Sequence, residues 1–77
     1  MNMTFQRKKL IYEIIEATKM ISGSVDGISG KLAATSDDQL KQLLRRLRAE
    51  LTPYHRMRLD NEMKSWLDQY ILEHPLA

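Results

Sequence analysis

The stretch from Ser36 to Leu51, SDDQLKQLLRRLRAEL, constrains the fold more than any other part of the chain. Five leucines recur in it at the spacing of one face of an α-helix, and they are Leu40, Leu43, Leu44, Leu47 and Leu51. Ser36 and Gln39 have the spacing of a capping box, which marks where such a helix begins. Because a face of five leucines must be covered, the stretch predicts a helix at about 37–51 that packs against other helices.

Two further segments have the apolar spacing of long helices. In the first, at about 4–21, one face is formed by Leu10, Ile14, Ala17 and Ile21. The second, at about 53–73, starts with a Thr52-Pro53 cap and ends before Pro75. Its broad apolar face consists of Leu59, Met63, Trp66, Leu67, Tyr70 and Ile71. We assign the core to Leu40, Leu44, Leu47, Met63, Trp66 and Tyr70.

The segment between the first two long helices holds all three glycines of the protein, Gly23, Gly27 and Gly30. Glycine costs about 1 kcal/mol relative to alanine inside a helix, so we expect only a short, weak helix or a loop at 24–34. Gly23 is well placed to end the first helix in the left-handed conformation. The predicted fold is therefore all-α, a small helical bundle of three main helices in a single domain over 1–77. We expect the last two helices to form an antiparallel hairpin about Thr52-Pro53.

Composition excludes several functional classes. The chain has no cysteine, which rules out disulfides, thiolate metal sites and cysteine nucleophiles. His55 and His74 lie nineteen positions apart, outside any metal-ligand spacing, and no serine, acid and histidine are linked by a catalytic pattern. The sequence has no long apolar run. We therefore expect no enzyme activity, no cofactor or metal, no membrane partner and a cytoplasmic location.

Some apolar residues lie outside the predicted core faces. Phe5, Tyr12 and Met20 project from the opposite side of the first helix, and Tyr54 and Met57 are out of phase with the apolar face of the last one. A helix in a bundle of 77 residues rarely buries two faces. We interpret these five residues as a contact with a partner or with a second copy of the chain.

Positive charge is concentrated in the second half of the chain. Residues 41–64 carry seven bases against three acids, although the formal net charge of the protein is only +2. Lys41, Arg45, Arg48 and Arg56 form the predicted basic patch, which favours an acidic protein surface or a phosphate backbone.

These features favour a non-enzymatic regulatory or adaptor protein that binds an acidic or helical surface of another protein and forms a homodimer through its first helix. The alternative is a small regulator resembling a helix-turn-helix, with nucleic acid as its partner. In that reading, a helix at 28–32 precedes a recognition helix at 36–51. Asp37 and Asp38 would then face the DNA at the start of the recognition helix, where phosphates repel them.

Overall fold

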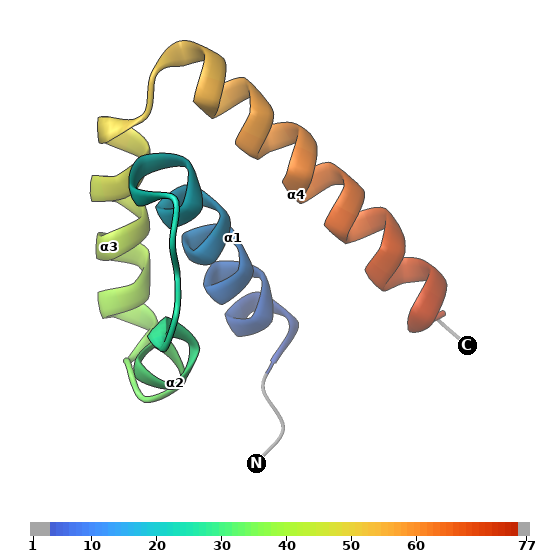
Figure 1. Ribbon diagram of the computed structural model, residues 1–77. Helices are drawn as coiled ribbons and strands as arrows, with labels where there is room; N and C mark the ends of the chain where they lie inside the picture. Colours follow the sequence, from blue (N-terminus) through green and yellow to red (C-terminus); the bar gives the residue numbers. More distant parts are fainter. Residues whose placement is uncertain (1–3, 76–77) are drawn as a thin grey trace.

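The computed structural model describes residues 4–75, and all of the regular secondary structure within that range is helical (Figure 1). The helices are α1 (Phe5–Ser22), α2 (Ile28–Ala33), α3 (Asp37–Glu50) and α4 (Pro53–Glu73). The predicted all-α fold with three main helices is thus confirmed. The short segment predicted at 24–34 contains helix only from residue 28 to residue 33, after the non-helical stretch 23–27.

The three longer helices all begin at a side-chain cap. In each, a hydroxyl oxygen accepts a hydrogen bond from the backbone N–H three residues further along, and the capping residues are Thr4, Ser36 and Thr52. Such caps satisfy a backbone donor that has no partner within the helix. The starts predicted from Ser36 and from Thr52-Pro53 are therefore confirmed. Gly23 ends α1 with φ 78° and donates its N–H to the Lys19 carbonyl, as its left-handed conformation predicts.

Helix α1 is the centre of the molecule. Figure 1 shows α3 and α4 on different sides of α1, with α2 near its N-terminal end. The predicted α3–α4 hairpin is wrong, because α4 turns away from α3 after Leu51 and packs along α1 instead. Only the first half of α4 contacts the end of α3, through hydrogen bonds such as that from Arg56 Nε to the Arg48 carbonyl.

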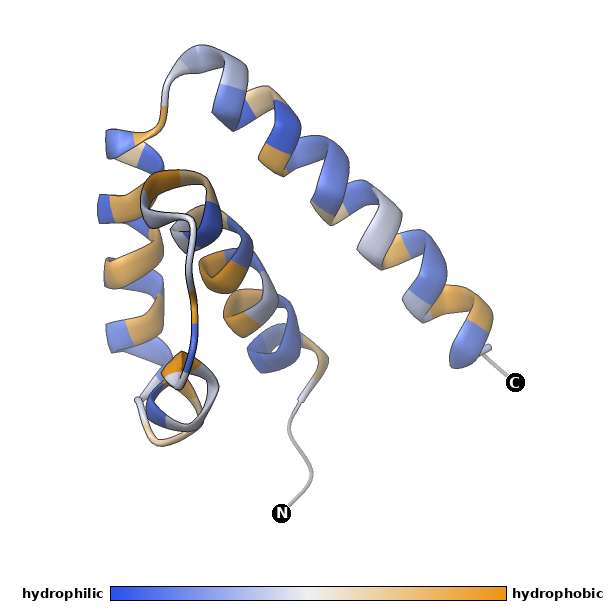
Figure 2. Ribbon diagram, viewed as in Figure 1, coloured by the Kyte–Doolittle hydropathy of each residue, from blue (hydrophilic) through white to orange (hydrophobic). Residues whose placement is uncertain are grey.

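The core consists of two clusters that follow each other along α1. The first contains Ile11, Ile14, Leu32 and Leu40, and the second contains Ala17, Leu51, Leu59 and Met63. Leu47 packs against both clusters. In Figure 2 apolar segments recur along the neighbouring helices α1 and α3, in agreement with the first cluster. Burial of these side chains supplies most of the stabilisation of a bundle this small.

Two residues assigned to core faces from the helical spacing are exposed, and two more, Leu67 and Tyr70, are half-buried outside both core clusters. Ile21 is 44 % exposed in the last turn of α1, and Ile71 is 54 % exposed near the end of α4. Ile71 follows Tyr70, and consecutive positions of a helix point about 100° apart. Since Tyr70 faces α1, Ile71 points to the side of α4 and is exposed.

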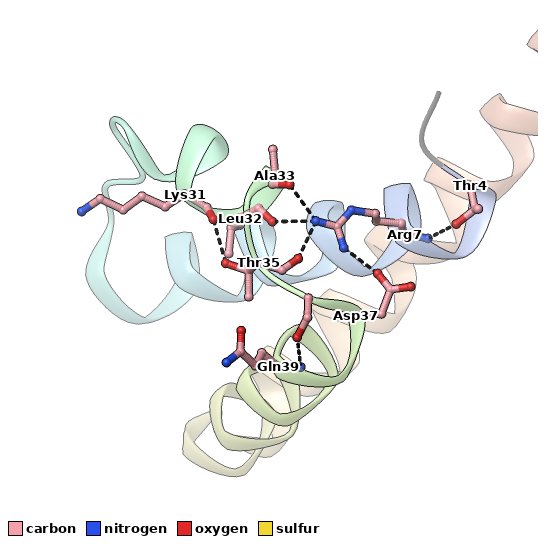
Figure 3. Close-up of polar contacts among 9 residues, drawn as sticks. Thr4, Arg7, Lys31, Leu32, Ala33, Thr35, Asp37 and Gln39 are labelled. Atoms are coloured by element: carbon pink, nitrogen blue, oxygen red, sulfur yellow. Dashed lines mark hydrogen bonds and ion pairs between the residues drawn. The ribbon is translucent and has the colours of Figure 1, made fainter. Parts of the chain in front are cut away.

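A single arginine of α1 fixes the position of α2 and of the start of α3 (Figure 3). The Arg7 guanidinium donates to the carbonyls of Leu32, Ala33 and Thr35 and forms an ion pair with Asp37. Free carbonyls at the end of a helix need donors, and a guanidinium supplies several in a fixed plane. Arg7 therefore joins the first three helices at one point.

Candidate binding groove between α1 and α4

Four aromatic rings connect the C-terminal half of α4 to α1. The Trp66 ring lies 5.6 Å from the ring of Phe5, 5.6 Å from that of Tyr12 and 5.3 Å from that of Tyr70. Phe5 and Tyr70 are 4.9 Å apart. We call these four residues the aromatic cluster. Ring pairs at such separations contribute about 0.5–1.5 kcal/mol beyond the area that they bury, so the cluster holds α4 on α1.

The aromatic cluster has a basic end. The His74 ring stacks on Tyr70 at 4.1 Å, and its Nδ1 lies 3.1 Å from the Tyr70 carbonyl. The Lys8 Nζ lies 5.9 Å from the centre of the Tyr70 ring, where the negative face of the ring attracts the ammonium group. Lys8 from α1 and His74 from the end of α4 thus both lie against the ring of Tyr70.

A groove of about 330 Å³ lies beside the aromatic cluster and is open to solvent along one side. Its lining is mostly apolar. Helix α1 contributes Lys8, Ile11, Tyr12 and Ile15, and helix α4 contributes Trp66, Tyr70 and His74. We refer to this feature as the groove. Apart from Tyr12 and Tyr70, the lining contains two titratable side chains, those of Lys8 and His74. It contains no aspartate or glutamate.

Burial raises the pKa of the Tyr12 phenol, and the neighbouring carboxylates of Glu16 and Glu62 raise it further. Loss of the proton would place a negative charge on the edge of an apolar groove beside two existing negative charges. The Tyr12 hydroxyl is therefore neutral at physiological pH and acts in the groove as a polar, uncharged group.

A second, more polar hollow lies further along the same pair of helices. It has a volume of about 290 Å³ and is lined by Glu16, Lys19, Met20, His55, Arg58 and Glu62. Lys19 forms an ion pair with Glu16 at 3.2 Å. Charges of both signs occur here, so the two ends of the α1–α4 junction differ in their electrostatics.

The five residues predicted to contact a partner do not form one surface. Phe5 and Tyr12 belong to the aromatic cluster within the chain, and Met20 is half-buried against the second core cluster. Tyr54 and Met57 are more than half exposed at the N-terminal end of α4. Of the five, only Tyr12 lines the groove.

The predicted basic patch is divided in the same way. Arg48 lies between α1 and α4, with its guanidinium 2.8 Å from the Glu13 carboxylate and 2.9 Å from that of Asp60. The hydrogen bond to Asp60 raises the pKa of Arg48, against the opposing effect of burial. Arg56 donates to the Arg48 carbonyl at 3.0 Å and so caps the end of α3. Lys41 and Arg45 are exposed on α3.

Tyr12 is the one groove residue that was identified from the sequence as a site residue. The other six were not identified in this way, and they are Lys8, Ile11, Ile15, Trp66, Tyr70 and His74. The sequence does contain a signal that places Lys8 and Ile15 beside Tyr12. The three residues follow each other at spacings of four and three, so they lie along one side of α1. No sequence signal links His74 to Lys8. Their proximity depends on the antiparallel packing of α4 on α1.

No helix within residues 4–75 is long and apolar enough to cross a lipid bilayer. In the same range, no three side chains of histidine, aspartate or glutamate are grouped as metal ligands. Comparison of the chain with models of protein families, with curated proteins and with solved structures gives no match.

Proposed function

We propose that this protein is a non-enzymatic binding module that acts as a regulator or adaptor by holding a segment of another protein in the groove between α1 and α4. The observation that carries the proposal is the groove itself. Ile11, Ile15, Tyr12 and Trp66 present an apolar surface that the chain leaves open on one side. An open groove with apolar walls and few polar groups is typical of surfaces that bind peptides or helices.

The rigidity of the walls also favours binding. Trp66 is held by ring contacts with Phe5, Tyr12 and Tyr70, and Ile11 and Ile15 belong to or pack against the first core cluster. Side chains fixed by packing lose little conformational freedom when a ligand binds, which lowers the entropic cost of association. The groove is therefore suited to binding without prior rearrangement.

The proposal is tested by affinity capture from a cell lysate with the full chain and two matched variants. Ile15→Gln introduces a polar amide into the groove, whereas Ile71→Gln makes the same change at an exposed position of α4 outside the groove lining. We expect proteins bound by the wild type to be retained by Ile71→Gln and lost from Ile15→Gln. Equal recovery by both variants would argue against the groove as the binding surface. Circular dichroism establishes that both variants are folded.

The same variants test the predicted homodimer. Sedimentation velocity at several protein concentrations measures self-association, and a dimer that dissociates in Ile15→Gln would use the groove. A dimer that Ile15→Gln leaves intact would place the contact elsewhere, for example at Tyr54 and Met57.

DNA binding is the alternative function, and it makes a different prediction. Lys41 and Arg45 are exposed on α3, while Asp37 at the start of that helix is held by Arg7 and Asp38 is exposed. A gel-shift titration against duplex DNA at increasing salt would show a steep loss of affinity if several phosphates were contacted. Binding that is weakened by Arg45→Gln and unaffected by Ile15→Gln would favour the alternative.

A further inference from the structure

The distribution of charge along the groove indicates what kind of segment it binds. Its centre is apolar, and Lys8 and His74 stand together at one end against Tyr70. The other end leads toward the mixed charges of Glu16, Lys19 and their neighbours. An occupant therefore meets a positive charge without acidic neighbours in the lining at the Lys8 end, and charges of both signs toward the other end.

We infer that the groove binds one amphipathic helix of a partner protein, with apolar side chains over Ile15, Tyr12 and Trp66 and a carboxylate against Lys8. This inference rests on the proposed function and specifies its partner. The bound helix would cover the side of α1 that α2, α3 and α4 leave open.

The dimensions of the groove suit a helix. From Lys8 to Ile15 the groove follows α1 for two turns, a length of about 10 Å. A docked helix presents apolar residues at positions i, i+3 or i+4, and i+7 over such a distance. A small molecule is a poorer fit, because sites for small molecules bury about 70–90 % of the ligand and this groove is largely open to solvent.

The acidic character follows from the position of Lys8. Lys8 is an exposed residue, and its ammonium group lies over the face of Tyr70 and has no acidic neighbour within the groove lining. A helix that packs over the groove removes water from this ammonium, which favours a partner that supplies a carboxylate in its place. A basic residue at the same position would be repelled.

The test is selection from a phage-displayed library of helical peptides, each of about fifteen residues, against the full chain. Peptides are retained if they bind wild type and not Ile15→Gln. Affinities are then measured with synthetic, tryptophan-free peptides through the fluorescence of Trp66, the single tryptophan of the protein, which lines the groove. Lys8→Glu reverses the charge at the groove, and Lys9→Glu reverses the next charge along α1, which lies outside the groove lining.

We expect the selected peptides to carry apolar residues at helical spacing and an excess of aspartate or glutamate at one flank. Lys8→Glu should weaken their binding about tenfold, whereas Lys9→Glu should change it by less than about twofold. A second selection against Lys8→Glu should enrich lysine or arginine at the same flank.

The inference would be overturned if the groove-dependent peptides showed no preference for acidic residues. It would also be overturned if Lys8→Glu and Lys9→Glu weakened binding equally. Either result would leave the proposed function standing. The proposed function itself fails by a different result, namely lysate capture that Ile15→Gln does not reduce. Thermal unfolding of both charge variants, followed by circular dichroism, shows whether a loss of binding reflects a loss of fold.

Discussion

The Arg48 bridge between α1 and α4 offers the sharpest test of how the helices are held together. Its guanidinium pairs with Glu13, whose side chain is only 13 % exposed, and with Asp60, whose side chain is 63 % exposed. Arg48→Met keeps most of the aliphatic contact and removes the charge. Asp60 can then be solvated by water, but Glu13 remains a nearly buried carboxylate without its partner. The loss of Glu13's partner therefore dominates the cost.

The magnitude lies between two limits. Breaking a buried ion pair by removing one partner costs about 3–5 kcal/mol, and an exposed pair contributes about 0.2–1 kcal/mol. Because Arg48 is one-third exposed, we expect Arg48→Met to cost about 2 kcal/mol. A chain of this size is stable by about 4–12 kcal/mol, so the loss is substantial. At a slope of about 1 kcal/mol per molar urea, the unfolding midpoint would fall by about 2 M.

The assay is urea unfolding at 25 °C, followed by circular dichroism, for Arg48→Met, Glu13→Gln and the double variant. Since Glu13→Gln removes the charge that Arg48→Met leaves unpaired, the double variant should lose about 1 kcal/mol less than the two single losses added together. Arg45→Met is the control, because Arg45 is exposed on the same helix. The bridge does not couple α1 to α3 and α4 if Arg48→Met costs no more stability than Arg45→Met. The same conclusion follows if the losses of Arg48→Met and Glu13→Gln simply add in the double variant.

Three further predictions concern the core, the glycines and pH. Leu59→Ala, at a fully buried position, should cost about 3 kcal/mol in thermal unfolding, whereas Leu72→Ala, at a 76 % exposed one, should cost less than about 0.5 kcal/mol. Gly23→Ala should destabilise by about 1 kcal/mol because φ is 78°, and Gly30→Ala, within α2 and with open space around the added Cβ, should stabilise by about 0.5–1 kcal/mol. A raised pKa of Tyr12 means that the unfolded chain releases this proton first, so stability should fall as pH rises through about 10 and beyond. Tyr12→Phe should reduce that alkaline loss, measured by urea unfolding at pH 8–11.

Local features of the fold could be predicted because their causes are local. Ser36 and Thr52-Pro53 place helix starts through bonds to residues three positions away, and Gly23 ends a helix through its own conformation. The leucine spacing of residues 37–51 likewise identifies a face to be buried, and Leu40 is fully buried.

The arrangement of the helices could not be predicted in this way. A short link at Thr52-Pro53 is compatible with a hairpin, but the direction of α4 is decided by what its apolar face packs against. Phe5 and Tyr12 showed that α1 has a second apolar face, and the helical spacing does not say whether that face meets another protein or α4. Trp66 and Tyr70 of the same chain contact it.

The charged residues show the same limit. Arg48 and Arg56 are predicted from the sequence to be surface bases, because their sequence neighbours are basic. In the structure, Arg48 is paired with acids from α1 and α4. The Glu13 pair joins residues thirty-five positions apart, and the Asp60 pair joins residues twelve apart across a helix break. Only the packed structure brings such groups together. A count of charges along the chain therefore overestimated the basic surface that is available to a partner.

The glycine-rich segment keeps the second helix of the chain short. A helical bundle closes when each side of its central helix is covered by helices of comparable length. Helix α1 has eighteen residues and α2 has only six, because the chain between Gly23 and Gly27 is not helical. Two of the glycines have positive φ, a conformation that a continuous helix does not allow. The short α2 thus contacts only part of α1, and under the proposed function the helix of a partner covers α1 along the groove.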